Sequence, residues 1–220
     1  DLHKGEIFGL CGLSDSGIRE VGQAAYGLLP VDSGEVSLPT HNVSIGNPYQ
    51  ALQNRVAYVP KDRDGEALMM GASIQNNFCL PSVETLKGRF GFLSPKKLYQ
   101  ASSKAREQFS VKSTGVDQLM RALSGGNKQK VNLGRWLIKD LDVLIVDCPT
   151  RGVDIGVKAY IYQCLREAKE KGMAILLITD ELSEVLGMAD TIAVMKDGEI
   201  CKLLPRSAEL SEETIIEVMT

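Results

Sequence analysis

Histidine and aromatic residues are scarce in this chain: its 220 residues include 2 histidines, and Phe, Trp and Tyr together make up 5%. With only His3 and His41, a zinc site or a catalytic triad built on histidine has little support. No Cys-x-x-Cys pair occurs, and the 5 cysteines are odd in number and scattered. This pattern is typical of reduced thiols in a hydrophobic core and not of a disulfide framework.

Long apolar runs and an excess of basic residues are missing too. No run approaches the roughly 18 residues that a membrane-spanning helix needs. The 25 Lys and Arg are outnumbered by 28 Asp and Glu, and the net charge of -3 argues against a protein that binds nucleic acid by neutralising phosphates. The 44% hydrophobic residues are enough for one large core or two smaller lobes.

Aliphatic runs alternate with helix-like stretches along much of the chain. Strand-like runs occur at residues 6–11, 55–59, 143–146 and 174–178, and helix-like stretches at 20–29 and 158–171. Buried runs separated by helices predict an α/β fold with a parallel sheet covered on both faces. Because the first run begins so soon after Asp1, we expect the chain to be part of a longer protein.

Two other segments break the alternation. From residue 66 to about 121 the composition turns to Gln, Asn, Lys and Ser with apolar residues at helical intervals, which predicts a mostly helical insert. Within it, Ser94 would cap a helix and Pro95 would occupy its first turn. Near the end, "TIAVMKDGEICKL" predicts a β-hairpin that turns at Asp197 and Gly198 and forms an antiparallel edge to the sheet.

The stretch "GLSDSGIREVG", residues 12–22, joins the first strand to the first helix. Gly12 and Gly17 have the glycine spacing of the phosphate-binding pattern G-x-x-x-x-G-K-[ST], and backbone amides at a helix start bind anions. A glycine pair at such a position is also explained by a tight turn. A Rossmann fingerprint fits less well, because the G-x-G-x-x-G spacing is absent.

The stretch "LSGGNKQK", residues 123–130, is more specific. Ser124 is a good N-cap, and Gly125 and Gly126 allow a close approach of the backbone. The helix that follows would place three apolar side chains on one side: Leu133, Trp136 and Leu137. A flexible, glycine-containing loop before a helix is the alternative, but it does not explain the segment at residues 142–156 that follows.

One helix length later, "DVLIVDCPTRGVDIG" runs from residue 142 to 156. Its strand ends in Asp147, which delivers a carboxylate to the C-terminal edge of the sheet, where such folds bind ligands and where an aspartate orients Mg²⁺. An aspartate that only caps a turn is the alternative, and the order of the motifs makes it a poor explanation. "AILLITDELSEVLGMADTIAVMKDGEI" then supplies a strand, a polar turn, a helix and the hairpin.

In this order, the motifs resemble the nucleotide-binding domain of ABC transporters. Residues 5–200 follow that pattern, and the match is best to the second, C-terminal ATPase domain of the duplicated subunit in ribose- and galactose-type sugar importers. Asn127, where glutamine is usual, and the "RGVD" of residues 151–154 point to this branch.

The resemblance implies a P-loop NTPase-like core of RecA type at residues 1–64 and 123–220 and a helical subdomain at 65–122. It implies ATP with Mg²⁺ shared between two head-to-tail domains, a permease docked near the helical lobe, and a peripheral place at the cytoplasmic face of the membrane. The metal would lie at Asp147. The nucleotide-binding positions would be Gly12, Ser14, Asp15, Ser16, Gly17, Ile18 and Arg19 in the loop, and Ser124, Gly125, Gly126 and Asn127 in the signature motif.

Positions that the resemblance would give to catalysis are altered. Ile18 stands at the phosphate-binding lysine, and Arg19 stands where a Ser or Thr hydroxyl would bind Mg²⁺. Lys61 takes the place of the Q-loop glutamine, Cys148 that of the catalytic glutamate, and Asp180 that of the switch histidine. Neutral sequence drift at a tolerant position would explain any one of these changes. It is a poor explanation for all of them together. We assign no residue of this chain a catalytic role.

The sequence therefore predicts an ABC domain whose own site is degenerate and hydrolyses ATP very slowly, while its signature motif completes the ATP site of a partner. That partner would be the N-terminal ABC domain of the same polypeptide. A non-catalytic ABC-type scaffold or regulatory domain is the alternative, although it has no evident need for the "LSGGN" motif. An ABC ATPase acting on DNA or ribosomes is disfavoured by the acidic balance.

Overall fold

The computed structural model describes residues 1–13, 15–207 and 210–219. These residues form two compact units. The first unit comprises Asp1–Tyr58, Leu141–Cys148 and Tyr162–Thr220, and the second comprises Val59–Asp140 and Pro149–Ile161. Each unit has its own hydrophobic cluster.

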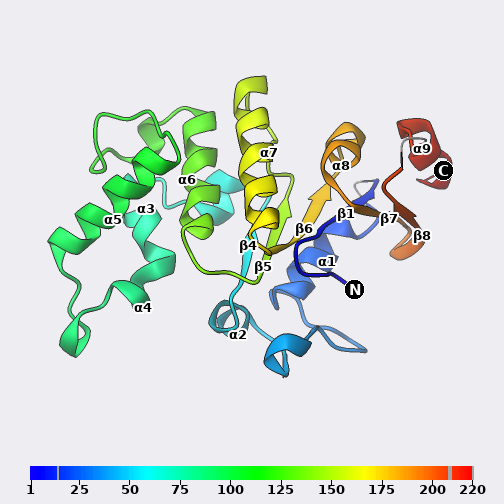
Figure 1. Ribbon diagram of the computed structural model, residues 1–220, viewed down its shortest axis with the longest axis horizontal. Helices are drawn as coiled ribbons and strands as arrows, with labels where there is room; N and C mark the ends of the chain where they lie inside the picture. The colour runs from blue at the N-terminus through cyan, green and yellow to red at the C-terminus, as the bar shows by residue number, and fades with distance from the viewer. Residues whose placement is uncertain (14, 208–209, 220) are drawn as a thin grey trace. The chain divides into compact units, whose positions relative to one another are not determined.

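A six-stranded sheet organises the first unit (Figure 1). Its strands are β1 (Ile7–Gly12), β4 (Val56–Val59), β5 (Val143–Asp147), β6 (Ala174–Thr179), β7 (Thr191–Lys196) and β8 (Glu199–Pro205), in the order β4-β5-β6-β1-β7-β8. β5 pairs with β6, β6 with β1 and β1 with β7 in parallel, and β8 pairs antiparallel with β7. The edge hairpin turns at Asp197 and Gly198, whose φ angles of 50° and 82° suit a type I′ turn, so this prediction is confirmed.

Helices cover both faces of the sheet, as the aliphatic runs predicted. Successive side chains of a strand point to opposite faces. Leu10 belongs to the same buried cluster as Ile18 of α1 (Ile18–Ala25), while a Cβ on Gly9 would lie 2.2 Å from Val185 of α8 (Leu182–Met188). α1 and α8 therefore pack on opposite faces of β1.

Some local predictions need correction. The first helix ends at Ala25 and not at Leu29, because Gly27 adopts a left-handed φ of 79°. The segment after it forms a small antiparallel ladder and a short helix, which the sequence did not indicate. The remaining elements of this region and of the carboxyl end are β2 (Ser37–Leu38), β3 (Val43–Ser44), α2 (Pro48–Gln53) and α9 (Glu212–Met219).

The second unit is helical. It contains α3 (Ile74–Cys79), α4 (Val83–Leu86), α5 (Pro95–Gln108), α6 (Gly125–Leu137) and residues 155–161 of α7 (Ile155–Glu170). α5 begins at Pro95 after Ser94, as predicted, although the Ser94 side chain makes no capping hydrogen bond. Phe78 and Phe109 stack with ring centroids 6.4 Å apart in the core of this unit. None of the described helices is both long and apolar enough to cross a membrane.

Candidate functional site

The carboxyl ends of three parallel strands bring the predicted motifs of the first unit to one edge of the sheet. Cys11 of β1 is in register with Thr179 of β6, and Asp147 of β5 is in register with Ile178. The glycine loop that follows β1 therefore starts beside the ends of the strands that carry Asp147 and precede Asp180. Ligands of open α/β sheets bind at this edge.

The glycine loop is a tight turn, and two of its positions require glycine. Ser16 donates from its backbone amide and its Oγ to the Leu13 carbonyl, at 2.9 and 2.7 Å. A Cβ on Gly12 would lie 2.2 Å from Ser16 Oγ, and Gly17 has a left-handed φ of 90° directly before α1. Asp15 is exposed. Ser14 lies outside the described residues.

Ile18, which the sequence predicts to stand at the phosphate-binding lysine position, points into the core. Its side chain is 3% exposed and belongs to the cluster that includes Leu10 and Met195. A side chain buried in this way offers no hydrogen-bond donor to a ligand. At Ile18 only the backbone is left to contact a ligand: it belongs to the first turn of α1, where amides lack an intrahelical partner.

Arg19 forms an ion pair with the aspartate at the end of β5. Its Nε donates to Asp147 Oδ2 at 2.9 Å, and the Tyr58 hydroxyl donates to the same oxygen at 3.3 Å. Asp147 is fully buried, and its Oδ1 has no hydrogen-bond partner among the described residues. The sequence singled out Asp147 and Arg19 separately, but it gave no sign of their contact or of Tyr58.

Two other substituted positions also contact each other. The Cys148 thiol donates to Asp180 Oδ1 over 3.7 Å, and the Cys148 amide donates to the Ile178 carbonyl at 2.8 Å. Cys148, directly after Asp147, has a left-handed φ of 46°. A thiol that donates its hydrogen to a carboxylate is not positioned to accept a proton from water.

In the second unit, the predicted signature motif starts α6. Ser124 is the N-cap, and its Oγ accepts from the Asn127 amide at 3.4 Å and from Asn127 Nδ2 at 2.8 Å. Asn127 Oδ1 accepts in turn from the Lys112 amide at 2.8 Å. Ser124 itself is exposed, so the start of the helix is accessible.

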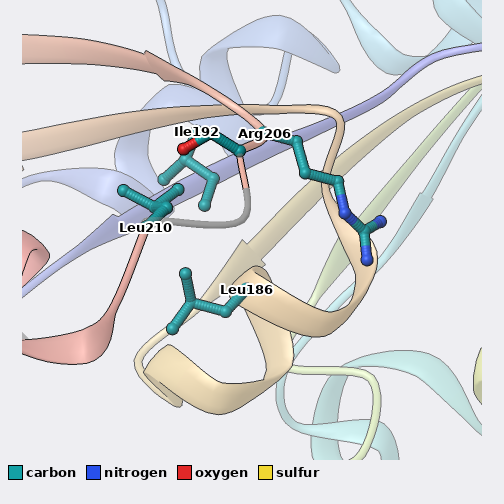
Figure 2. Close-up of a pocket in the computed structure, with 5 residues that line it drawn as sticks. Leu186, Ile192, Arg206 and Leu210 are labelled. Atoms are coloured by element: carbon teal, nitrogen blue, oxygen red, sulfur yellow. The ribbon is translucent and has the colours of Figure 1, made fainter.

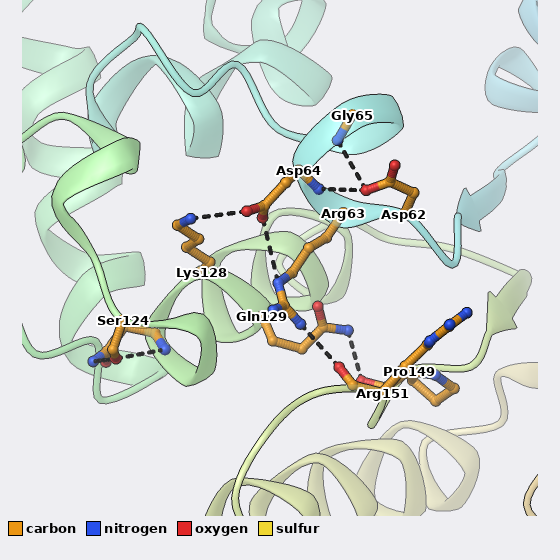
Figure 3. Close-up of polar contacts among 10 residues, drawn as sticks. Asp62, Arg63, Asp64, Gly65, Ser124, Lys128, Gln129, Pro149 and Arg151 are labelled. Carbon is orange, nitrogen blue, oxygen red and sulfur yellow. Dashed lines mark hydrogen bonds and ion pairs between the residues drawn. The ribbon is translucent and has the colours of Figure 1, made fainter.

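The next turn of α6 holds the segment that follows β5 (Figure 3). Gln129 Nε2 donates to the Pro149 carbonyl at 2.6 Å, and Arg63 Nη1 donates to the Arg151 carbonyl at 3.0 Å. Lys128 pairs with Asp64 at 2.9 Å. No motif in the sequence singled out Arg63, Asp64 or Gln129; the run "KDRDGE" at residues 61–66 was the only local signal for the first two.

The two signature glycines are packed against neighbours within this unit. A Cβ on Gly126 would lie 2.7 Å from Val157 Cγ2, and one on Gly125 would lie 3.1 Å from Arg63 Nη2. Close packing therefore requires a glycine at position 126 whether or not a ligand binds. Leu133 and Trp136 are buried and Leu137 is half-buried, as the helical spacing predicted.

Comparison with known proteins agrees with these motifs. The sequence profile of the family described as "ABC transporter" matches residues 1–151. The chain belongs to the ABC transporter family.

Similar proteins support this membership. A putative ribose/galactose/methyl galactoside import ATP-binding protein of Agrobacterium fabrum is 39% identical over the whole of this chain, which spans 44% of that relative's length. The crystal structure of a nucleotide-free ATP-binding cassette from an ABC transporter has a TM-score of 0.81 and 21% identity, with 100% of this chain and 89% of that one covered. A dimeric post-hydrolysis cassette bound to ADP and Pi has a TM-score of 0.81 and 19% identity, with 94% and 88% covered. The fold is thus the α/β ABC ATPase fold that the sequence predicted.

Two further features are described, each within its own unit. Lys61 is half-buried in the second unit, directly after β4. A pocket in the first unit is lined by Leu186, Ile192, Arg206, Ser207 and Leu210 (Figure 2). None of the predicted site residues that the structure describes is among these five.

The ABC family implies a Mg²⁺ ion bound with the nucleotide, and the residues at this loop do not fit one. Mg²⁺ demands a near-octahedral set of oxygen ligands. Arg19 offers no acceptor atom, and it engages Oδ2 of Asp147, so that Oδ1 is the acceptor left on that carboxylate. No group of three or more His, Cys, Asp or Glu among the described residues could hold a metal ion.

Proposed function

We propose that this chain is an ATP-binding domain of an ABC importer for ribose, galactose or a related small solute. It works beside the N-terminal ABC domain of the same polypeptide and with permease subunits at the cytoplasmic face of the membrane. The similarity to a ribose/galactose/methyl galactoside import ATP-binding protein supports the solute class, and that relative is more than twice as long as the chain.

The observation that carries the proposal is the accessible start of α6. Ser124 is exposed at the N-cap, and the amides of Gly125 and Gly126 follow it on a helix of 13 residues. The positive end of the helix dipole and free amides stabilise a phosphate at this place. In a head-to-tail pair, this helix start binds the γ-phosphate of ATP held by the partner's loop.

The chain's own loop is degenerate in this proposal. Ile18 is committed to the core, and the Cys148 thiol gives its hydrogen to Asp180 instead of accepting a proton from water. The loss of a general base alone slows a reaction by about 10² to 10⁴. The ATP of the pair is therefore hydrolysed in the composite site that the partner's loop and Ser124 form.

The test is Ser124→Ala in the complex of this chain with a competent partner domain, with ATP turnover as the measurement. Ser73→Ala is the matched control, because Ser73 caps α3 and its Oγ accepts from the Asn76 amide at 3.1 Å. Each variant should lose about 1 kcal/mol of stability. Only Ser124→Ala should reduce turnover, by about tenfold or more. Equal turnover in the two variants contradicts the role of the signature motif, and rapid turnover by the chain alone contradicts the degeneracy.

A non-catalytic ABC scaffold is the second candidate, and the paired substitutions favour it. Arg19 is matched by Asp147, and Cys148 is matched by Asp180, so the altered positions form contacts of their own. A scaffold has no use for nucleotide at α6. An assembly with permease that forms equally well with and without ATP, and in which Ser124→Ala changes nothing, favours this candidate.

A further inference from the structure

We propose that the guanidinium of Arg19 replaces the divalent cation at the glycine loop, and that this loop binds a nucleoside triphosphate free of metal. The inference takes the nucleotide class from the proposed function. What it adds is the form of the ligand: a metal-free triphosphate whose charge is balanced by a side chain of the protein.

The position of Arg19 is the first support. It is the second residue of α1, directly after the turn that Gly12 and Gly17 make possible, and its side chain is 35% exposed. Its Nε lies 2.9 Å from Oδ2 of the fully buried Asp147. A guanidinium carries five N–H donors in a planar fork, so it serves a carboxylate and a phosphate oxygen at the same time.

The balance of charge is the second support. A fully buried carboxylate is stable only when it is paired. Asp147 obtains its positive partner from Arg19 and a further hydrogen bond from the Tyr58 hydroxyl at 3.3 Å. A dication at the remaining oxygen, Oδ1, would lie within a few ångströms of this guanidinium, and the two positive charges would repel each other.

The same charges explain why a phosphate still has a place here. Without a cation, Asp147 would repel a triphosphate that enters the loop. Arg19 neutralises this carboxylate and adds a strong donor beside the first turn of α1, whose dipole also attracts anions. Both functions of a metal ion, shielding the aspartate and contacting phosphate, are thus assigned to one side chain.

The experiment measures ATP binding to the full 220-residue chain by calorimetry, once with excess Mg²⁺ and once with EDTA. We expect excess Mg²⁺ to weaken binding by about tenfold or more, because Mg²⁺ complexes ATP in solution and the loop takes only the metal-free triphosphate. A direct measurement accompanies it: electron paramagnetic resonance with Mn²⁺ and ATP should show no Mn²⁺ immobilised by the wild-type chain.

Variants of Arg19 distinguish the loss of its positive charge from a loss of folding. Arg19→Ser should weaken binding in EDTA by about 10- to 100-fold, the range expected for one charge-assisted hydrogen bond. Excess Mg²⁺ should restore part of this loss in Arg19→Ser. The double variant Arg19→Ser with Asp147→Asn leaves no buried charge unpaired, should fold even if the single variant does not, and should bind weakly in both buffers.

The matched control is Arg55→Ser. Arg55 pairs with Asp142 at 3.3 Å in the same unit and is about as exposed as Arg19, at 41%. This variant should leave both dissociation constants unchanged.

Three results would overturn the inference: ATP binding to the wild type that excess Mg²⁺ leaves unchanged or tightens, Mn²⁺ immobilised beside the bound nucleotide, or no ATP binding in either buffer. In each case the proposed function stands or falls separately, because it relies on Ser124 and the partner's ATP. If Ser124→Ala slows the complex while the loop binds no ATP, only the inference on Arg19 has failed.

Discussion

Cys148 Sγ and Asp180 Oδ1 lie 3.7 Å apart, with the thiol as donor. These residues follow β5 and β6, two strands that pair in parallel, so the contact joins neighbouring carboxyl ends of the sheet. The resemblance of the sequence predicts that these positions are those of the catalytic glutamate and the switch histidine. The substitutions at the two positions are therefore complementary to each other, and this complementarity has consequences that can be measured.

Restoring the glutamate alone should harm the protein and give no ATP hydrolysis. In Cys148→Glu a carboxylate faces that of Asp180, and we expect a loss of about 1 to 2 kcal/mol of stability, reduced by solvent because Asp180 is exposed. Urea denaturation at neutral pH measures the loss. Adding Asp180→Asn should recover most of it, and Cys148→Asn, which keeps a neutral donor and tolerates the left-handed backbone, is the control. A Cys148→Glu variant as stable as the wild type would show that the pairing has no energetic role.

Gln129 should stabilise the segment after β5. Its side chain is 4% exposed and donates to the Pro149 carbonyl at 2.6 Å (Figure 3). Gln129→Leu keeps the bulk and removes the donor, which should cost about 1 to 3 kcal/mol in thermal or urea denaturation. Gln163→Leu is the control, because Gln163 is exposed and its bond to Glu167 is a surface contact, so a change within about 0.5 kcal/mol is expected. Equal losses would assign the effect to helix propensity.

Residues that act within one local pattern could be predicted from the sequence. The hairpin turn at Asp197 and Gly198, Ser124 as an N-cap and Asp147 at the end of an aliphatic strand each follow from a few neighbouring residues. The contact of Arg19 with Asp147 joins residues 128 positions apart, and nothing near either residue encodes it.

Other features that the sequence did not predict depend on neighbouring residues, but the sequence pattern that indicates them is weak. The ladder of β2 and β3 has two residues in each strand, too few for an alternating pattern to be visible. α1 ended early because Gly27 takes a left-handed conformation, whereas the apolar residues Leu28 and Leu29 continue the helical spacing beyond it.

Cys11 should make the protein less stable at alkaline pH. Burial raises the pKa of its thiol from 9.0 to about 12, so the unfolded chain loses this proton at a lower pH than the folded chain. The contribution is therefore complete below pH 9.0 and is lost as the pH rises toward 12, at about 1.4 kcal/mol per pH unit. The stability advantage of the wild type over Cys11→Ala, measured with urea at several pH values, should shrink above pH 9. A constant difference would contradict the raised pKa.

The exposed phenylalanines of the second unit should bind the permease in the proposed assembly. Phe90 and Phe92 are 83% and 76% exposed between α4 and α5, and aromatic side chains so open to water mark interaction surfaces. The double variant Phe90→Asn with Phe92→Ser suits the left-handed backbone at position 90 and should leave the melting temperature unchanged. We expect it to lower co-purification with the permease by about tenfold, as the loss of two interface anchors does. Tyr49→Ser, at a 69% exposed aromatic of the first unit, is the control that should assemble normally. If the two variants assemble alike, the permease binds elsewhere, and the exposed phenylalanines need another explanation.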